Sequence, residues 1–100
     1  MPARAREQRL GALQKANKIR AERARLKRDL AAGRVQISKV LAHPPEFADT
    51  ERVVVLLLAV PKYGPARVSK LLTRERISAT KRLGGLTDRQ RQALIRHFQH

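Results

Sequence analysis

The sequence has 100 residues, no cysteine, 3% aromatic residues and a formal net charge of +15 at pH 7, so a single domain with a small aliphatic core is predicted. Without cysteine the chain can form no disulfide, thiolate metal site or cysteine nucleophile, and this composition is compatible with an intracellular location. The longest apolar run, residues 53–60, is far shorter than the roughly 20 residues of a membrane-spanning helix, and the charged N-terminal segment is unlike a secretory signal.

Residues 3–32 are predicted to form one long basic helix. The segment contains no proline, a single glycine and many strong helix formers, and Gly33 is expected to act as its C-cap rather than as a hinge. The apolar residues that share one helix face, and so should reach the core, are Ile19, Leu26 and Leu30. Because so little of this helix can be buried, residues 1 to about 12 are expected to be poorly ordered without a partner.

A short second helix is predicted near residues 35–41, ending before Pro44 and Pro45. Residues 45–60 follow, with an acidic stretch ahead of the apolar run, and are predicted to form a central core helix. The valines of the run favour a strand, and periodicity alone does not separate the two structures. A helix is favoured because sixteen residues are long for a strand and no second strand is available to pair with it.

Two more helices are predicted in the C-terminal part of the chain. The first covers about residues 65–74, where proline suits the first helical position. Residues 77–86 are predicted to be irregular, and Thr87 with Gln90 forms a capping box for a last helix over residues 88–98. The predicted fold is therefore all-α.

The basic residues are gathered in two blocks that flank a neutral centre. Residues 1–34 hold 11 Lys or Arg and 3 acidic residues, residues 35–60 hold 2 and 3, and residues 61–100 hold 10 and 2, so the net charges are +8, −1 and +8. We divide the chain accordingly into a long basic helix, residues 1–34, and a small helical domain, residues 35–100. So large a charge on a small body predicts a polyanionic partner, above all nucleic acid. The alternative is that Arg and Lys only solubilise exposed helix faces.

The stretch from residue 60 to residue 94 is predicted to act as a clamp on phosphate groups. At the turn around Gly64 and Pro65, free backbone N–H groups and the positive end of a helix dipole would meet a phosphate without reading a base. A second turn, with Lys81 and Arg82, is expected to face the same way and to hold the neighbouring strand. The candidate DNA-binding residues are Lys62, Tyr63, Gly64, Pro65, Arg67, Lys70, Lys81, Arg82, Gly85, Arg20, Arg23 and Lys27.

Three segments resemble the actinobacterial integration host factors, which are small helical nucleoid-associated proteins: RAERARLKRDLAAG at residues 20–33, VPKYGPARVSKLL at 60–72 and ISATKRLGGLTDRQRQAL at 77–94. The resemblance covers about residues 13–98. It implies a helix-two-turns-helix motif, which is also found in a small-subunit ribosomal protein and in the formamidopyrimidine-glycosylase group. It further implies a duplex-DNA binder that contacts phosphates and the minor groove and that bends or compacts DNA with little sequence preference.

The two turns of the family can be placed on this sequence. Its Gly-Val-Gly-Lys-like first turn falls on residues 62–65, with the following arginine on Arg67, and its Arg-Arg-Leu-Arg-Gly-Leu second turn falls on residues 81–86. Gly64 and Arg67 match closely. The sequence departs from the family pattern at three positions, with Lys62 for Gly, Pro65 for Lys and Gly84 for the third Arg.

These observations predict a DNA-binding protein and not an enzyme. The expected partner is double-stranded DNA, bound by a monomer in the cytoplasmic nucleoid, with no metal, cofactor, small-molecule substrate or membrane. The histidines lack the spacing of a metal site, and Pro2 lacks the glutamate that follows the nucleophilic proline of the related glycosylases. An RNA-binding or ribosome-associated protein is the alternative, because charge alone does not separate A-form from B-form duplexes. Tyr63 is expected either against a deoxyribose ring or as a cap over the core.

Overall fold

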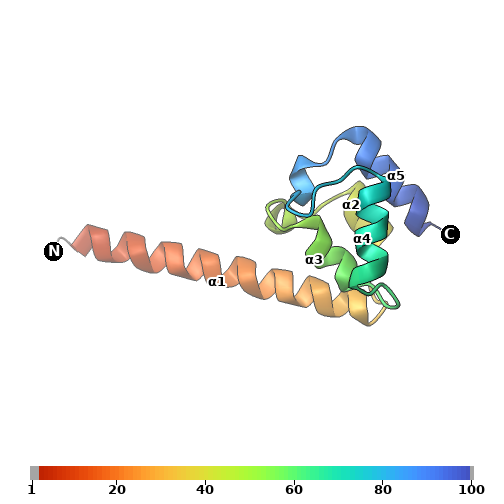
Figure 1. Cartoon of the computed structure of the whole chain (residues 1–100). Coiled ribbons are helices and arrows are strands. Elements are labelled where there is room, and N and C mark those ends of the chain that lie inside the picture. The colour runs from red at the N-terminus through yellow and green to blue at the C-terminus, as the bar shows by residue number, and fades with distance from the viewer. Residues whose placement is uncertain (1–2, 100) are drawn as a thin grey trace.

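A computed structural model describes the backbone of residues 3–99 and the side chains of residues 9–99. Every regular element in this range is helical, and a lone antiparallel bridge joins Arg52 to Arg82. Helix α1 (Ala3–Ala31) leans out from a small domain that the remaining helices form, so the molecule is elongated, with extents of 55 × 27 × 23 Å (Figure 1). None of the helices described is both long and apolar enough to cross a membrane.

Only the C-terminal part of α1 packs against the domain. Leu26 and Leu30 are buried in the core, whereas Leu10 and Leu13 are 53% and 60% exposed. Helix α1 begins at Ala3, and the expectation that residues 1 to about 12 are poorly ordered without a partner stays a prediction; residues 1 and 2 lie outside the described range. Strong helix formers allow the helix to continue without tertiary contacts.

The end of α1 is the predicted glycine cap. Gly33 is in the left-handed region with φ 75°. Its N–H donates to the carbonyl of Leu30 at 3.2 Å, and the N–H of Arg34 donates to the carbonyl of Asp29 at 2.9 Å. These two hydrogen bonds form a Schellman motif, which ends the helix and turns the chain toward the core.

The central segment is helical, as predicted, but its α-helix is much shorter than residues 45–60. Helix α2 (Ile37–Ala42) stops before the two prolines, a 3₁₀ turn η1 (Glu46–Ala48) follows, and α3 covers only Val53–Leu58. The N–H of Val53 donates to the carbonyl of Lys81 at 2.9 Å. Residues 49–52 are therefore hydrogen-bonded to a distant part of the chain and cannot extend α3 backward.

Helices α4 (Pro65–Arg74) and α5 (Asp88–Phe98) have the predicted bounds. The capping box is present, because Thr87 Oγ1 accepts from the N–H of Gln90 at 3.1 Å and Gln90 Oε1 accepts from the N–H of Thr87 at 3.0 Å. Between the two helices lies a 3₁₀ turn, η2 (Leu83–Gly85). α2 packs against α5, and α3 packs against α4. The most deeply buried large side chains of the core are Leu41, Leu56, Leu57, Leu83, Leu94, Val53 and Val68.

Just after the end of α4, Arg76 has a backbone conformation in which glycine would be unstrained. Arg76 has φ 57°, its N–H donates to Thr73, and the N–H of Ile77 donates to Leu72 at 2.8 Å. We expect Arg76→Gly to be more stable than Arg76→Ala by about 1 kcal/mol, because glycine has no Cβ to strain this conformation. The melting temperature should differ by about 4–8 °C in thermal unfolding. Both variants lose the same charge, so equal melting temperatures would contradict the assignment of strain.

Candidate nucleic-acid interface

The first turn joins α3 to α4 and carries a strained lysine. Lys62 has φ 71°, and it stands where the first turn of the family has a glycine. Gly64, by contrast, has φ −80° and ψ 174°, a conformation that any residue adopts. Gly64 is the N-cap of α4 without a capping side chain, and Ala66 and Arg67 after it are exposed. The N–H groups of the first turn of α4 therefore face solvent beside positive charge, which suits a phosphate.

Tyr63 fixes the first turn against α5 and supports Arg67. Its hydroxyl lies 3.0 Å from His97 Nε2, and its ring centroid lies 4.9 Å from that of Phe98. The guanidinium of Arg67 lies 4.4 Å from the centroid of the Tyr63 ring and donates to the carbonyl of Lys62. The half-buried ring thus caps this side of the core and holds Arg67 over its face, a cation–π contact. Contact of Tyr63 with a sugar ring stays a prediction.

His97 links Tyr63 to α4. Its Nδ1 lies 3.2 Å from Arg74 Nη2. A guanidinium can only donate, so Nδ1 accepts and the proton of the neutral ring lies on Nε2. Nε2 therefore donates to the hydroxyl of Tyr63, so the first turn is hydrogen-bonded to α5 and is linked through His97 to Arg74 at the end of α4.

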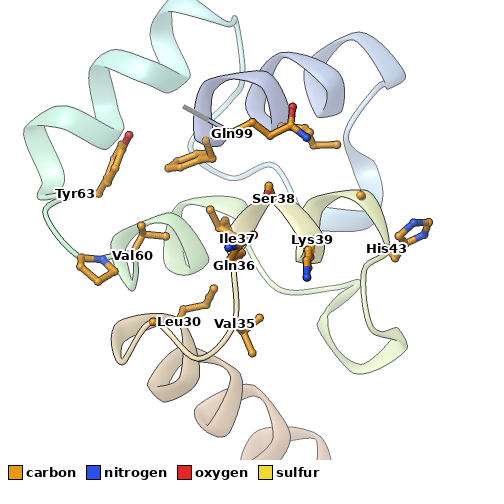
Figure 2. Close-up of a pocket in the computed structure, with 15 residues that line it drawn as sticks. Leu30, Val35, Gln36, Ile37, Ser38, Lys39, His43, Val60, Tyr63 and Gln99 are labelled. Carbon is orange, nitrogen blue, oxygen red and sulfur yellow. The ribbon is translucent and has the colours of Figure 1, made fainter.

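A groove of about 780 Å³ lies beside the first turn. Figure 2 shows Tyr63 and Val60 on one side of it, with Lys39 of α2 and His43, the residue after α2, toward the other. None of the described residues that line it carries a carboxylate side chain. No group of three or more His, Cys, Asp or Glu able to hold a metal ion occurs among the described residues. The groove separates the first turn from α2.

The second turn uses several of its backbone amides within the chain. The N–H of Leu83 donates to the carbonyl of Glu51, and the N–H of Gly84 donates to the carbonyl of Asp49, both at 2.8 Å. Sequence reasoning assigned the Lys81 and Arg82 side chains to phosphate at this turn, and the N–H groups of Leu83 and Gly84 are not available to it. Two basic side chains of this turn could meet a phosphate: Arg82, which is exposed, and Lys81, which is half-buried.

The departure from the family pattern at Gly84 also has a structural cause. A Cβ built on Gly84 would lie 2.6 Å from the Asp49 carboxylate oxygen Oδ1. Any larger residue, including the arginine of the family, would force Asp49 to move. Gly85 is exposed and has no such neighbour, since a Cβ there would lie 3.8 Å from the Lys81 side chain.

The structure brings Arg23 of α1 and Arg82 of the second turn together at Thr50. Arg23 Nη2 donates to Thr50 Oγ1, and Arg82 Nη1 donates to the carbonyl of Thr50. Arg23 Nε also donates to the carbonyl of Phe47 at 2.9 Å. We call Arg23 and Arg82 the arginine pair. Sequence reasoning chose both arginines but missed Thr50, which no motif marks.

The remaining candidate residues lie near the first turn or in α1. Lys70 is exposed one helical turn beyond Arg67, and with Lys62, Arg67 and the free amides of α4 it makes up what we call the first-turn surface. Pro65 is the first residue of α4 and is exposed. In α1, Arg20 is exposed and donates to Asn17 Oδ1 at 3.5 Å, whereas Lys27 is half-buried.

The two turns do not form one cluster. The first turn follows the C-terminal end of α3, whereas the second is hydrogen-bonded to the residues that lead into its N-terminal end; Figure 1 shows them at opposite ends of this helix. They form two basic surfaces at the two ends of a helix of six residues, and the expectation that they clamp neighbouring strands of one duplex stays a prediction. Gly64 and Arg82, on which that expectation depended, are both exposed.

One arginine of the C-terminal block is structural. Arg91 is half-buried, and its Nη1 and Nη2 donate to the carbonyls of Leu41 at 2.7 Å and Leu83 at 3.0 Å. It thereby joins α5 to the end of α2 and to the second turn. The net charge of residues 61–100 is therefore larger than the positive charge that a partner can contact.

Comparison with known proteins gives concordant results. A family model described as the S13-like H2TH domain matches residues 30–98. The chain is 42% identical over 94 residues to the integration host factor of Mycobacterium tuberculosis, covering 92% of this chain and 90% of the relative. It is 33% identical to the integration host factor of Streptomyces coelicolor, covering 92% and 88%. The solved structure of sIHF bound to an 8-base-pair palindromic DNA is similar with a TM-score of 0.79 and 29% identity, over 85% of this chain and 98% of that chain.

Proposed function

Because the chain belongs to the actinobacterial integration host factors, we propose that it binds duplex DNA through the phosphate backbone and the minor groove, with little sequence preference, and bends or compacts it. The family is one of DNA-binding proteins and not of enzymes. The observation that carries the proposal is the pair of exposed basic surfaces on a fold similar to one solved with DNA. Both surfaces offer guanidinium, ammonium or amide donors, which fix a protein on DNA without specifying a sequence.

The separation of the two surfaces supports bending or bridging by a monomer. The first-turn surface and the arginine pair lie at opposite ends of α3, so one molecule can contact two stretches of backbone. Helix α1 has 29 residues and so a length of about 43 Å. Its segment 9–21 carries four basic residues and no acidic one, which favours a course along or beyond the bound duplex. A protein of this kind belongs in the nucleoid.

RNA is the second candidate, because the matching domain is described as S13-like and the motif is shared with a ribosomal protein. A-form RNA presents a wide, shallow minor groove and 2′-hydroxyl groups, whereas B-form DNA presents narrower spacing between phosphates across its minor groove. Surfaces held at fixed positions by α3 should therefore fit one form better than the other.

The test is a panel of labelled 20-base-pair duplexes of random, A/T-rich and G/C-rich sequence, in gel-shift titrations with double-stranded RNA of equal length as competitor. We expect dissociation constants within about threefold across the DNA panel and weaker competition by RNA. Arg67→Glu and Arg82→Glu should each weaken all DNA sequences about equally, by about tenfold or more.

The matched control is Arg89→Glu, since Arg89 lies on α5, is bonded to Glu75 and belongs to neither surface as defined above. Its affinity should change much less than that of the other two reversals. A loss confined to particular sequences would indicate base readout instead. Competition by RNA as good as that by DNA would favour the ribosome-associated alternative.

A further inference from the structure

The arginine pair lies beside an acidic turn of the same chain. Residues 49–51 read Asp-Thr-Glu, and the carbonyls of Asp49 and Glu51 hold the second turn in place. The carboxylate of Glu51 points to the same region: its Oε2 lies 4.0 Å from Arg23 Nε, and its Oε1 accepts from the N–H of Arg52 at 3.2 Å. The acidic turn therefore lies against Arg23 of the arginine pair.

The two guanidinium groups of the arginine pair have N–H groups that are not used within the chain. A guanidinium carries five N–H groups in a planar fork. Arg23 uses Nε and Nη2, and Arg82 uses Nη1, on atoms of this chain. Their remaining N–H groups have no partner among the described residues, and Thr50 between them is exposed. Such a fork binds two oxygens of one phosphate at once, which a single carboxylate at 4.0 Å does not satisfy.

We propose that Arg23 and Arg82 form one phosphate subsite at Thr50, and that the carboxylate of Glu51 is its internal competitor. The inference rests on the proposed function and names a subsite within it, joined from α1 and the second turn. Without nucleic acid, Glu51 partly neutralises Arg23. A phosphodiester that binds there must displace this carboxylate or tolerate its repulsion, because the Glu51 side chain is only 15% exposed and cannot be fully screened by water.

The contact between Glu51 and Arg23 also affects which anions bind at the arginine pair. A free chain with an uncovered arginine pair would attract any anion, whereas only a partner that supplies several phosphates at once outcompetes the tethered carboxylate. Glu51 therefore lowers affinity for single anions more than for a duplex that also occupies the first-turn surface.

The test compares Glu51→Gln with Glu46→Gln in binding to a 12-base-pair duplex. Each variant removes one negative charge, but Glu46 is exposed in η1 and its side chain has no hydrogen bond or ion pair in the structure. We expect Glu51→Gln to bind DNA about three- to tenfold more tightly than the native chain, and Glu46→Gln less than about twofold. In an Arg23→Gln background the gain from Glu51→Gln should vanish, as a double-mutant cycle requires of a coupled pair.

Equal effects of the two glutamate variants would overturn the proposal, and so would a gain that persists without Arg23. If Arg23→Gln does not fold, Arg23→Lys, which keeps the charge but loses the fork, serves as the background and should retain less than half of the gain. A native chain that binds no duplex at all would refute the proposed function itself, an outcome distinct from both.

Nuclear magnetic resonance of the arginine Nε–H groups separates the two sources of phosphate. Titration with the duplex should shift the signals of both Arg23 and Arg82, and inorganic phosphate should shift the same two signals at much higher concentration. In Glu51→Gln the phosphate titration should saturate earlier than in the native chain. A duplex that binds without moving either signal would overturn the subsite while leaving DNA binding intact, and shifts by inorganic phosphate alone would mark a small-anion site that DNA does not use.

Discussion

The affinity of the chain for duplex DNA is expected to fall by about 10³- to 10⁴-fold between about 50 and 200 mM salt. The reason is that each phosphate neutralised by Lys or Arg releases condensed counterions, and more salt in solution makes this release less favourable. Contacts to some 6 to 8 phosphates correspond to a slope of roughly −5 to −7 in log affinity against log salt concentration. Fluorescence anisotropy of a labelled duplex across a salt series measures this slope.

Single substitutions should show how much each of the two surfaces contributes to the slope of log affinity against log salt concentration. Arg82→Ala and Arg67→Ala are each expected to make it shallower by about 0.9, since each removes one phosphate contact. Arg89→Ala serves as the control, because Arg89 is bonded to Glu75 and should leave the slope unchanged. A slope near zero for the native chain would show that the binding does not depend on the phosphate backbone.

Leu83→Ala is expected to destabilise the fold by about 3–4 kcal/mol. Leu83 lies in the second turn between the basic and the glycine residues, its side chain is 0% exposed, and its carbonyl accepts from Arg91. Truncation leaves a cavity that this short turn cannot close, because its backbone is bonded to Glu51. For a domain whose total free energy of unfolding is about 5–15 kcal/mol, the loss is severe. Urea denaturation should show the midpoint lowered by about 2 M.

Leu58→Ala is the matched control for this substitution. Leu58 is the last residue of α3 and is 42% exposed, so the same change in side chain should cost less than about 1 kcal/mol. If both variants lose the same stability, the second turn is not anchored by burial of Leu83. The comparison matters for function as well, because Arg82 is the direct neighbour of Leu83 and depends on this anchor for its position.

Local signals explain why several elements could be predicted from the sequence. The bounds of α4 and α5 follow from Pro65 and from the capping box of Thr87 and Gln90, and the end of α1 follows from Gly33. Each of these signals acts through hydrogen bonds or backbone preferences within about six residues, so no knowledge of the rest of the chain is needed. The candidate binding residues were likewise chosen from charge and spacing, and their contacts with DNA stay predictions.

What the sequence by itself determined is the helical class, the positions of the capped helix ends and the excess of positive charge. Only the tertiary structure decided how long α3 is, which amides remain free and which arginines meet. Arg23 and Arg82 contact Thr50 across separations of 27 and 32 residues, and the second turn loses its donors to Asp49 and Glu51. The physical reason is that such contacts depend on how the buried leucines bring distant segments together, and nothing in the local pattern around any of these residues records its partner.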